Sequence, residues 1–251
     1  APGATSVLWT GGIDNDWFKP GNWGGCAIPS CGTDAIIVPA SANQPVINAV
    51  GAAVKSLTIS GGATLSINAG FSLQVCQDLT NSGTLTASPT STVLFNNAAV
   101  NQNITGNFIG VNKFGNLTIT KTGGTVSLNN DADIGGTFTI SNATSALNAN
   151  GRYQKVAGNF TNYGTYTPGT GGTLEMNGTA AQTYYNAGTI NNLTMQHSGT
   201  GVTLATNCTL ANTGILSLNA GKIITTPSFE VAVTNRNVAS LPSGNATSFV
   251  Q

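Results

Sequence analysis

The chain is poor in the residue types that perform acid–base chemistry. It contains eight Asp and Glu residues in total and one histidine, His197. Glu175 stands alone between Leu174 and Met176, and no acidic residue lies near His197 in its Gln-His-Ser-Gly turn. The sequence has no nucleophile elbow and no phosphate-binding loop. We therefore predict that the protein is not an enzyme, with no catalytic residues and with His197 as a solvated turn residue.

Two Asp-x-Asp pairs are the candidates for metal binding. Asp14 and Asp16 lie near the N-terminus, and Asp131 and Asp133 precede a Gly-Gly pair. Oxygen-rich loops are typical Ca²⁺ sites. Neither pair has the full ligand spacing of a known calcium loop, and Asp is also an ordinary turn residue. Structural calcium and simple turn formation both remain open for these four residues, and we expect no other cofactor.

The elements that must position these residues are very short strands. Apolar residues alternate with Ser, Thr or Gln, as in Leu57 to Ile59, Leu117 to Ile119 and Leu216 to Leu218. This period of two places the apolar side chains on one face of each strand. Gly, Asn or Ser bounds most of the runs and indicates turns. No sustained helical period is present, so the pattern predicts an all-β protein.

A long internal repeat indicates how these strands are arranged. The sequence from Asp78 to Asn97 returns from Asn159 to Gly178, and the sequence from Asn116 to Leu128 returns from Asn192 to Leu204. Repeats at fixed spacing are typical of units that stack on copies of themselves. We therefore predict a parallel β-helix (β-solenoid), in which each coil stacks on the next. A β-sandwich would explain the strands but not the repeat.

We divide the chain into an N-terminal cap segment at 1–44 and a β-solenoid at 45–251. The solenoid contains the internal duplication, at about 57–137 and 138–218. The repeat places Asn81 and Asn162 at equivalent turn positions. These side chains either hydrogen-bond to Asn in the next coil or only form turns, which Asn favours in any case.

The cap segment contains all three tryptophans, Trp9, Trp17 and Trp23. A solenoid end exposes unpaired strand edges and therefore needs a cap, which large aromatic residues can supply. The alternative is a carbohydrate site, because the faces of aromatic rings stack on sugar rings. Cys26 and Cys31 flank the loop CAIPSC, and we predict a local disulfide between them that holds the cap and indicates an extracellular environment.

The other two cysteines are predicted to be unpaired with each other. Cys76 and Cys208 would lie several coils apart in a stacked rod, which is too far for a disulfide. Cys208 falls in line with the apolar residues and is expected to be a core thiol. A zinc site at Cys26 and Cys31 is disfavoured because no second Cys or His pair accompanies them.

The composition excludes several classes of partner. Charged residues make up 6% of the chain and its formal net charge is zero, compared with about 25% charged residues in an average soluble protein. A surface with so little charge favours self-association. The few Lys and Arg residues are scattered, so we expect no binding to nucleic acid. No apolar run is long enough to span a membrane.

The opening of the chain resembles that of secreted cell-surface β-helix repeat proteins of Bacteroidota. The resemblance is carried by Trp9 to Gly12, Asp16-Trp17, Asn22-Trp23, Asp34 to Pro39 and Pro45 to Ile47, and then by coils of the type NLTI and GTVSL. It implies a right-handed parallel β-helix, export by the type IX secretion route, and a role on the cell surface as an adhesin or structural element.

These observations predict a non-enzymatic, extracellular structural or adhesive cell-surface protein that assembles end to end into a fibre. The alternative is a glycan-binding surface module that uses the three tryptophans or a groove along the rod. The expected partners are accordingly further copies of the chain or extracellular glycans. A polysaccharide-active enzyme is disfavoured because no acid–base pair is visible. Ice binding would require a row of outward Thr-x-Thr pairs, and the candidates are Thr84/Thr86, Thr118/Thr120, Thr137/Thr139 and Thr165/Thr167.

Overall fold

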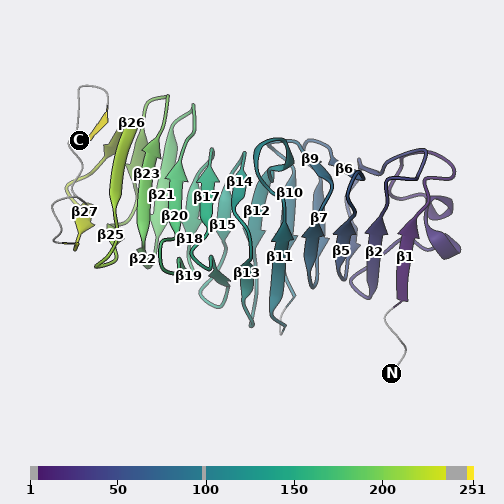
Figure 1. Cartoon of the computed structure of the whole chain (residues 1–251). Helices are drawn as coiled ribbons and strands as arrows, with labels where there is room; N and C mark the ends of the chain where they lie inside the picture. Colours follow the sequence, from purple (N-terminus) through teal and green to yellow (C-terminus); the bar gives the residue numbers. More distant parts are fainter. Residues whose placement is uncertain (1–4, 98–99, 236–247) are drawn as a thin grey trace.

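The chain forms a rod of stacked coils. The computed structural model describes residues 5–97, 100–235 and 248–251, and over these residues the chain is an all-β parallel solenoid of about nine turns. Figure 1 shows the strands side by side across the rod, from the N-terminal end to the C-terminal end. Each full turn contributes one short element to each of three faces. The predicted all-β solenoid is confirmed.

The strands lie on three faces that run along the rod. The first face contains β1 (Thr5–Trp9), β2 (Thr33–Ile37), β5 (Leu57–Ile59), β8 (Leu79–Asn81), β11 (Gln102–Gly106), β13 (Val126–Leu128), β16 (Ala146–Asn148), β19 (Thr165–Thr167), β22 (Thr189–Ile190), β25 (Cys208–Leu210) and β27 (Val231–Val233). The second face contains β3 (Val46–Ile47), β6 (Thr64–Ile67), β9 (Thr84–Ala87), η3 (Gly110–Asn112), β14 (Ala132–Ile134), β17 (Tyr153–Val156), β20 (Thr173–Met176), β23 (Asn192–Gln196) and the first part of β26 (Leu216–Ile224). The third face contains β4 (Ala52–Val54), β7 (Ser72–Val75), β10 (Thr92–Phe95), β12 (Asn116–Ile119), β15 (Phe138–Ile140), β18 (Phe160–Asn162), β21 (Gln182–Asn186), β24 (Val202–Leu204), the last part of β26 and β28 (Ser248–Val250).

Helical structure is confined to short 3₁₀ turns in the described part of the chain. These are η1 (Pro20–Asn22), η2 (Gly24–Cys26) and η3. No helix among these residues has the length and apolar character that a membrane crossing requires.

The core is a set of apolar columns that run along the inside of the rod. In β15 the side chains of Phe138 and Ile140 are fully buried, whereas Thr139 between them points outward. The strand register places Phe160 next to Phe138 and Tyr184 next to Phe160 in successive coils. Their ring centroids are 5.4 and 5.7 Å apart. Burial of each such side chain stabilises the fold by roughly 1.5–3 kcal/mol. The alternation of apolar and polar residues within a strand therefore determines which side of the strand faces the interior of the rod.

The turns are held by asparagine side chains. Asn81 Oδ1 accepts a hydrogen bond from the Gly83 N–H at 3.1 Å, and Asn162 Oδ1 accepts one from the Gly164 N–H at 2.9 Å. Asn162 Nδ2 also donates to Asn186 Oδ1 in the next coil at 2.7 Å. Asn81 Nδ2 likewise donates to the Asn107 carbonyl in the next coil at 2.6 Å. Both copies of the repeat therefore form the same local turn and a hydrogen bond to an Asn of the next coil, and in the second copy this bond joins two Asn side chains.

The two copies of the internal repeat occupy different faces. The first copy contains β8, β9 and β10, which lie on the first, second and third faces. The second copy contains β18, β19 and β20, which lie on the third, first and second faces. The duplication therefore does not correspond to a whole number of coils. This is possible because every face accepts the same short alternating strand.

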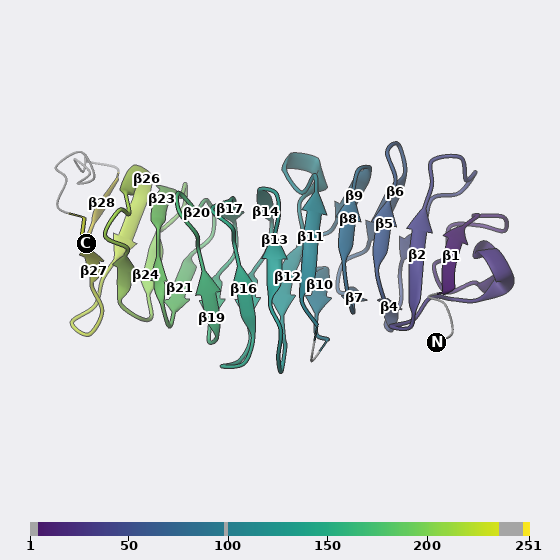
Figure 2. The same cartoon turned by 60° about the horizontal axis from the view of Figure 1, so that its bottom comes forward.

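The N-terminal segment begins as solenoid and then covers the end of the rod. Strands β1 and β2, both within the segment predicted to be a cap, are paired in the first face. Beyond β1 the chain loops over the end of the rod (Figure 2). There the Trp17 N–H donates to the Val46 carbonyl at 3.2 Å, and the Val46 N–H donates to the Asn15 carbonyl at 2.8 Å. The edge of β3 is thereby paired with the loop.

The disulfide differs from the predicted one. Cys31 is bonded to Cys76, with 5.4 Å between their Cα atoms, and Cys26 is an exposed free thiol. Cys26 ends the turn η2, after which Ala27 is extended rather than turned back. Stacking of the coils brings the end of β7, where Cys76 lies, beside Cys31, although 45 residues separate the two in sequence. Cys76 and Cys208 are not bonded, as predicted, and Cys208 is a buried thiol.

One lysine lies inside the rod. The Lys121 side chain is fully buried, and its ammonium group donates to the carbonyls of Asn97 and Val100 and to Gln102 Oε1. Burial lowers the pKa of the Lys121 ammonium. Its three donors have three acceptors, which is the condition under which a buried ammonium group is tolerated.

Candidate functional site

The three tryptophans do not form a surface platform for sugars. Trp9, Trp17 and Trp23 are at most 1% exposed. The ring of Trp23 packs edge-on against Trp9 at 4.9 Å and against Trp17 at 4.8 Å between centroids. Trp9 Nε1 donates to the Asn43 carbonyl at 2.6 Å, and Trp23 Nε1 donates to the Trp17 carbonyl at 2.8 Å. These residues form the core of the cap and have no ring face free to stack on a ligand.

The first Asp-x-Asp pair organises the cap loop. Asp14 forms an ion pair with Lys19 and accepts hydrogen bonds from Asn22 Nδ2 at 2.7 Å and from the Asp16 N–H at 3.0 Å. Asp16 Oδ1 accepts from the Phe18 N–H at 3.0 Å. The hydrogen bond from Lys19, followed by that from Asn22, lowers the pKa of Asp14 to about 2. Turn formation, one of the two open interpretations, is thus observed at this pair.

The structure gathers no metal-ligand cluster around either pair. Across residues 5–97, 100–235 and 248–251, no group of three His, Cys, Asp or Glu side chains is placed to hold a metal ion. His197 is also not solvated as predicted, because it is only 1% exposed. Its Nδ1 accepts from the Gly199 N–H and its Nε2 lies 2.8 Å from the Ala180 carbonyl. One ring nitrogen therefore contacts the turn that contains His197, and the other contacts the backbone of the preceding coil.

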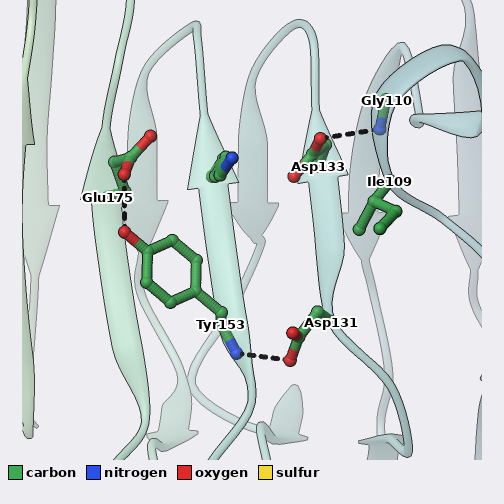
Figure 3. Close-up of a pocket in the computed structure, with 7 residues that line it drawn as sticks. Ile109, Gly110, Asp131, Asp133, Tyr153 and Glu175 are labelled. Carbon is green, nitrogen blue, oxygen red and sulfur yellow. Dashed lines mark hydrogen bonds between the residues drawn. The ribbon is translucent and has the colours of Figure 1, made fainter.

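The second Asp-x-Asp pair lies in a groove on the second face. This groove has a volume of about 560 Å³. Strands β14, β17 and β20 form its floor, and the segment that contains η3 forms its wall (Figure 3). The residues that line the groove are Ile109, Gly110, Asp131, Asp133, Tyr153, Lys155 and Glu175.

The wall of the groove exists because a loop replaces a strand on this face. Phe108 and Phe114 are buried and stacked, with ring centroids 4.6 Å apart, and they anchor both ends of the loop. Between these anchors Ile109 is 50% exposed and Val111 is 81% exposed. The chain enters the loop at Gly106, which has a φ of +115°. A Cβ atom added there would lie 2.0 Å from the Asn81 carbonyl oxygen, so the position has no room for a side chain. The result is a raised ridge beside β14.

The floor carries carboxylates whose positions are fixed by the backbone of neighbouring elements. Asp131 Oδ1 accepts a hydrogen bond from the Tyr153 N–H at 2.9 Å, and Asp133 Oδ2 accepts one from the Gly110 N–H at 2.8 Å (Figure 3). In each carboxylate the second oxygen has no hydrogen-bond partner among the described residues. The two aspartates therefore present fixed hydrogen-bond acceptors to the groove.

Tyr153 and Glu175 form a hydrogen-bonded pair at the far side of the floor. The Tyr153 hydroxyl donates to Glu175 Oε2 at 2.5 Å (Figure 3). Burial, followed by this hydrogen bond to Glu175, raises the pKa of Tyr153 to about 12. The phenol is therefore protonated at neutral pH and acts as a donor to the carboxylate. Although Glu175 is on the outer side of β20, it is only 8% exposed.

Lys155 lies between two of the acids in the strand register. It is opposite Asp133 on one side and opposite Glu175 on the other. Its ammonium group nevertheless forms no ion pair, since the ion pairs among the described residues are Lys19–Asp14 and Lys55–Asp34. The amine lies 5.9 Å from the centroid of the Tyr153 ring instead.

Sequence reasoning identified Asp131 and Asp133 but missed the other five residues that line the groove, three of which have polar or charged side chains. Tyr153, Lys155 and Glu175 come from the next two coils, and nothing local in the sequence connects them with the aspartates. A usable signal did exist in their alternation with buried neighbours, which places all three on the outer side of their strands. What the sequence lacked was the strand register.

The Thr-x-Thr pairs do not form a row. Thr84 and Thr86 lie on the second face, and Thr165 and Thr167 lie on the first. Thr118/Thr120 and Thr137/Thr139 share the third face, but the register pairs Thr118 with Thr139 and so offsets the two pairs by two residues. Ice binding therefore has no regular threonine surface among these pairs.

Comparison with known proteins matches the N-terminal part of the chain. A family model described as a domain of unknown function (DUF8693) matches residues 8–107, which include the cap, the disulfide and the strands from β2 to β11. No curated protein and no solved structure matches the chain. The groove residues lie outside the matched range. The match provides neither a named function nor a taxon, so the resemblance to surface proteins of Bacteroidota stays a prediction.

Proposed function

We propose that this protein is a non-enzymatic, extracellular adhesive module that binds glycans in the groove of the second face. The observation that carries the proposal is the concentration of charge there. The groove holds three of the eight carboxylates of a chain in which charged residues make up only 6%. It combines these acceptors with a free ammonium group and an apolar ridge. Ligand sites are typically concave and have few, well-placed polar groups.

A sugar chain suits this arrangement of groups. Sugar hydroxyls can donate to the free oxygens of Asp131 and Asp133 and accept from Lys155. The exposed side chain of Ile109 supplies an apolar surface for the C–H faces of the rings. Because parallel strands floor the groove, its fixed groups are spaced at about 4.8 Å intervals along the rod, which provides repeated contacts for an extended polymer.

The cap and the disulfide also support a displayed module rather than an end-to-end fibre. The cap loop pairs with the edge of β3, so this edge is not free to join another copy. The Cys31–Cys76 disulfide is consistent with an extracellular environment. Adhesion through a lateral groove leaves both ends of the rod unused.

The test is binding of the intact protein to an array of plant, algal, fungal and animal polysaccharides, followed by titration calorimetry on the hits. Replacement Ile109→Ala is expected to weaken binding about fivefold to tenfold through lost apolar contact. Val111→Ala is the matched control, because Val111 projects from the same loop without lining the groove. Absence of binding to every glycan would contradict the proposal, and release of shortened sugars from a bound glycan would contradict its non-enzymatic part.

A further inference from the structure

Glu175 is a buried carboxylate that forms no ion pair with another described residue. It is only 8% exposed, one of its oxygens accepts from Tyr153, and the other faces the groove without a partner. Neither of the ion pairs found in the described residues involves it. A buried charge without a partner destabilises the fold. A ligand that brings a positive charge into the groove would offset this cost.

The neighbouring groups make the groove negative as a whole. Asp131, Asp133 and Glu175 supply three carboxylates, and among the lining residues only Lys155 supplies an ammonium group. Each carboxylate keeps one oxygen free of protein hydrogen bonds. Complementary charge across an interface determines which partner is accepted and which is rejected. The charges of the lining residues complement a cationic sugar and not an anionic one such as a uronate.

We propose that the groove selects glycans that carry protonated amino groups, that is, polymers of 2-amino-2-deoxy sugars whose amines are not acetylated. This inference rests on the proposed function and specifies its ligand. Ammonium groups on two residues of the polymer donate to Glu175 and to Asp133, which lie two strands apart, while the Lys155 ammonium between them donates to a ring or hydroxyl oxygen. The same geometry gives an acetylated amine no charge to pair with Glu175.

The experiment compares short oligomers that differ mainly in charge. Glucosamine, N-acetylglucosamine, glucose and galacturonic acid oligomers of equal length are titrated into the intact protein at mildly acidic pH, where the amines are protonated. The glucosamine oligomer is expected to bind at least about tenfold more tightly than the glucose oligomer, the gain typical of one charged hydrogen bond. Oligolysine of equal charge tests whether any polycation suffices.

Charge-removing variants identify the residue responsible. Glu175→Gln keeps an acceptor for Tyr153 and is expected to weaken glucosamine binding about tenfold, with less than about a threefold change for glucose oligomers. Asp133→Asn is the second variant, in case the first fails to fold. Glu230→Gln, the same change at an exposed site outside the groove, is the control and is expected to change nothing.

The outcomes separate the two proposals. Equal or tighter binding of neutral, acetylated or uronate oligomers would overturn the selectivity for amino sugars and leave glycan binding in place. Tighter binding of oligolysine would overturn it in favour of a basic peptide ligand. If none of the sugars binds in this assay or on the array, both the inference and the proposed function fail.

Discussion

Lys155 on β17 and Glu175 on β20 lie opposite each other in register, yet no ion pair joins them. Lys155 therefore contributes little to folding, and Lys155→Met is expected to change the free energy of unfolding by less than about 0.5 kcal/mol. The same change makes the groove more negative but removes the hydrogen bond that Lys155 donates to the sugar, so binding of glucosamine oligomers should change by less than about threefold. Urea unfolding and calorimetric titration measure the two effects. Lys222→Met on β26, outside the groove, is the control.

The disulfide provides a prediction about stability. By the chain-entropy model, a bond that closes a loop of 45 residues stabilises the fold by about 4 kcal/mol. Cys76→Ala should therefore lower the free energy of unfolding by up to about that amount, whereas Cys26→Ala should change it by less than about 0.5 kcal/mol. Iodoacetamide should label Cys26 in the folded protein without reductant. Labelling of Cys31 or Cys76 instead would contradict the observed pairing.

Acid should loosen the cap before the rest of the rod. The pKa of Asp14 is lowered from 3.8 to about 2, so its ionised form stabilises the folded state above about pH 4, and this contribution is lost as pH falls toward 2. All three tryptophans are in the cap, so tryptophan fluorescence reports on this region alone. A shift in emission is expected in this pH window. Asp14→Asn should remove the pH dependence, while Glu230→Gln should retain it.

Alkali should destabilise the rod through thiol and phenol groups whose pKa the fold raises, among them Cys208 and Tyr153. Burial raises the pKa of Cys208 from 9.0 to about 12, and burial together with Glu175 raises that of Tyr153 from 10.0 to about 12. A raised pKa means that the unfolded state loses its proton first, so stability is intact below about pH 9 and falls as pH rises toward 12. Urea titrations across this range measure the decline. In Cys208→Ala the decline should begin nearer pH 10, and an unchanged profile would count against this assignment.

Lys121 tests the importance of the polar contacts inside the rod. Lys121→Met removes the donor to two carbonyls and to Gln102 Oε1, and leaves the buried Gln102 oxygen and two partly buried carbonyls without this partner. We expect a loss of about 3 kcal/mol in the free energy of unfolding. Lys113→Met, the same change at an exposed position, is the control. Equal stability of the two variants would show that the apolar replacement compensates fully.

The fold could be predicted because its determinants are local. Runs such as Leu117 to Ile119 carry their own alternation, and their Gly and Asn boundaries specify the turns. The buried thiol of Cys208 followed from the same parity. The sequence also assigned the three tryptophans to the cap segment. It could not decide whether their rings face the core or the solvent. Their burial depends on contacts between separate turns of the loop.

The pairing of distant residues could not be predicted. Cys31 meets Cys76 only because two particular coils stack in one register, and a partner closer in sequence was available. The groove, like the disulfide, is formed by residues that are distant in sequence and are brought together by the stacking of coils. Glu175 has only apolar sequence neighbours, but the ladder places it beside Lys155, and Tyr153 reaches it from the preceding coil. Such contacts depend on how many residues each turn contains, and the turns of this chain vary in length.

The out-of-phase repeat bears on how chains of this kind lengthen. The copy of β8 is β18, on a neighbouring face rather than directly along the rod. A gene duplication that extends such a chain therefore need not add complete coils. The solenoid can accommodate any whole number of strands together with the loops that join them. Each insertion also rotates the downstream sequence around the axis of the rod. Side chains that were aligned on one face are then distributed over all three faces. Growth of the polymer and inheritance of a binding surface are thereby uncoupled, and a site such as the groove must arise anew after each duplication.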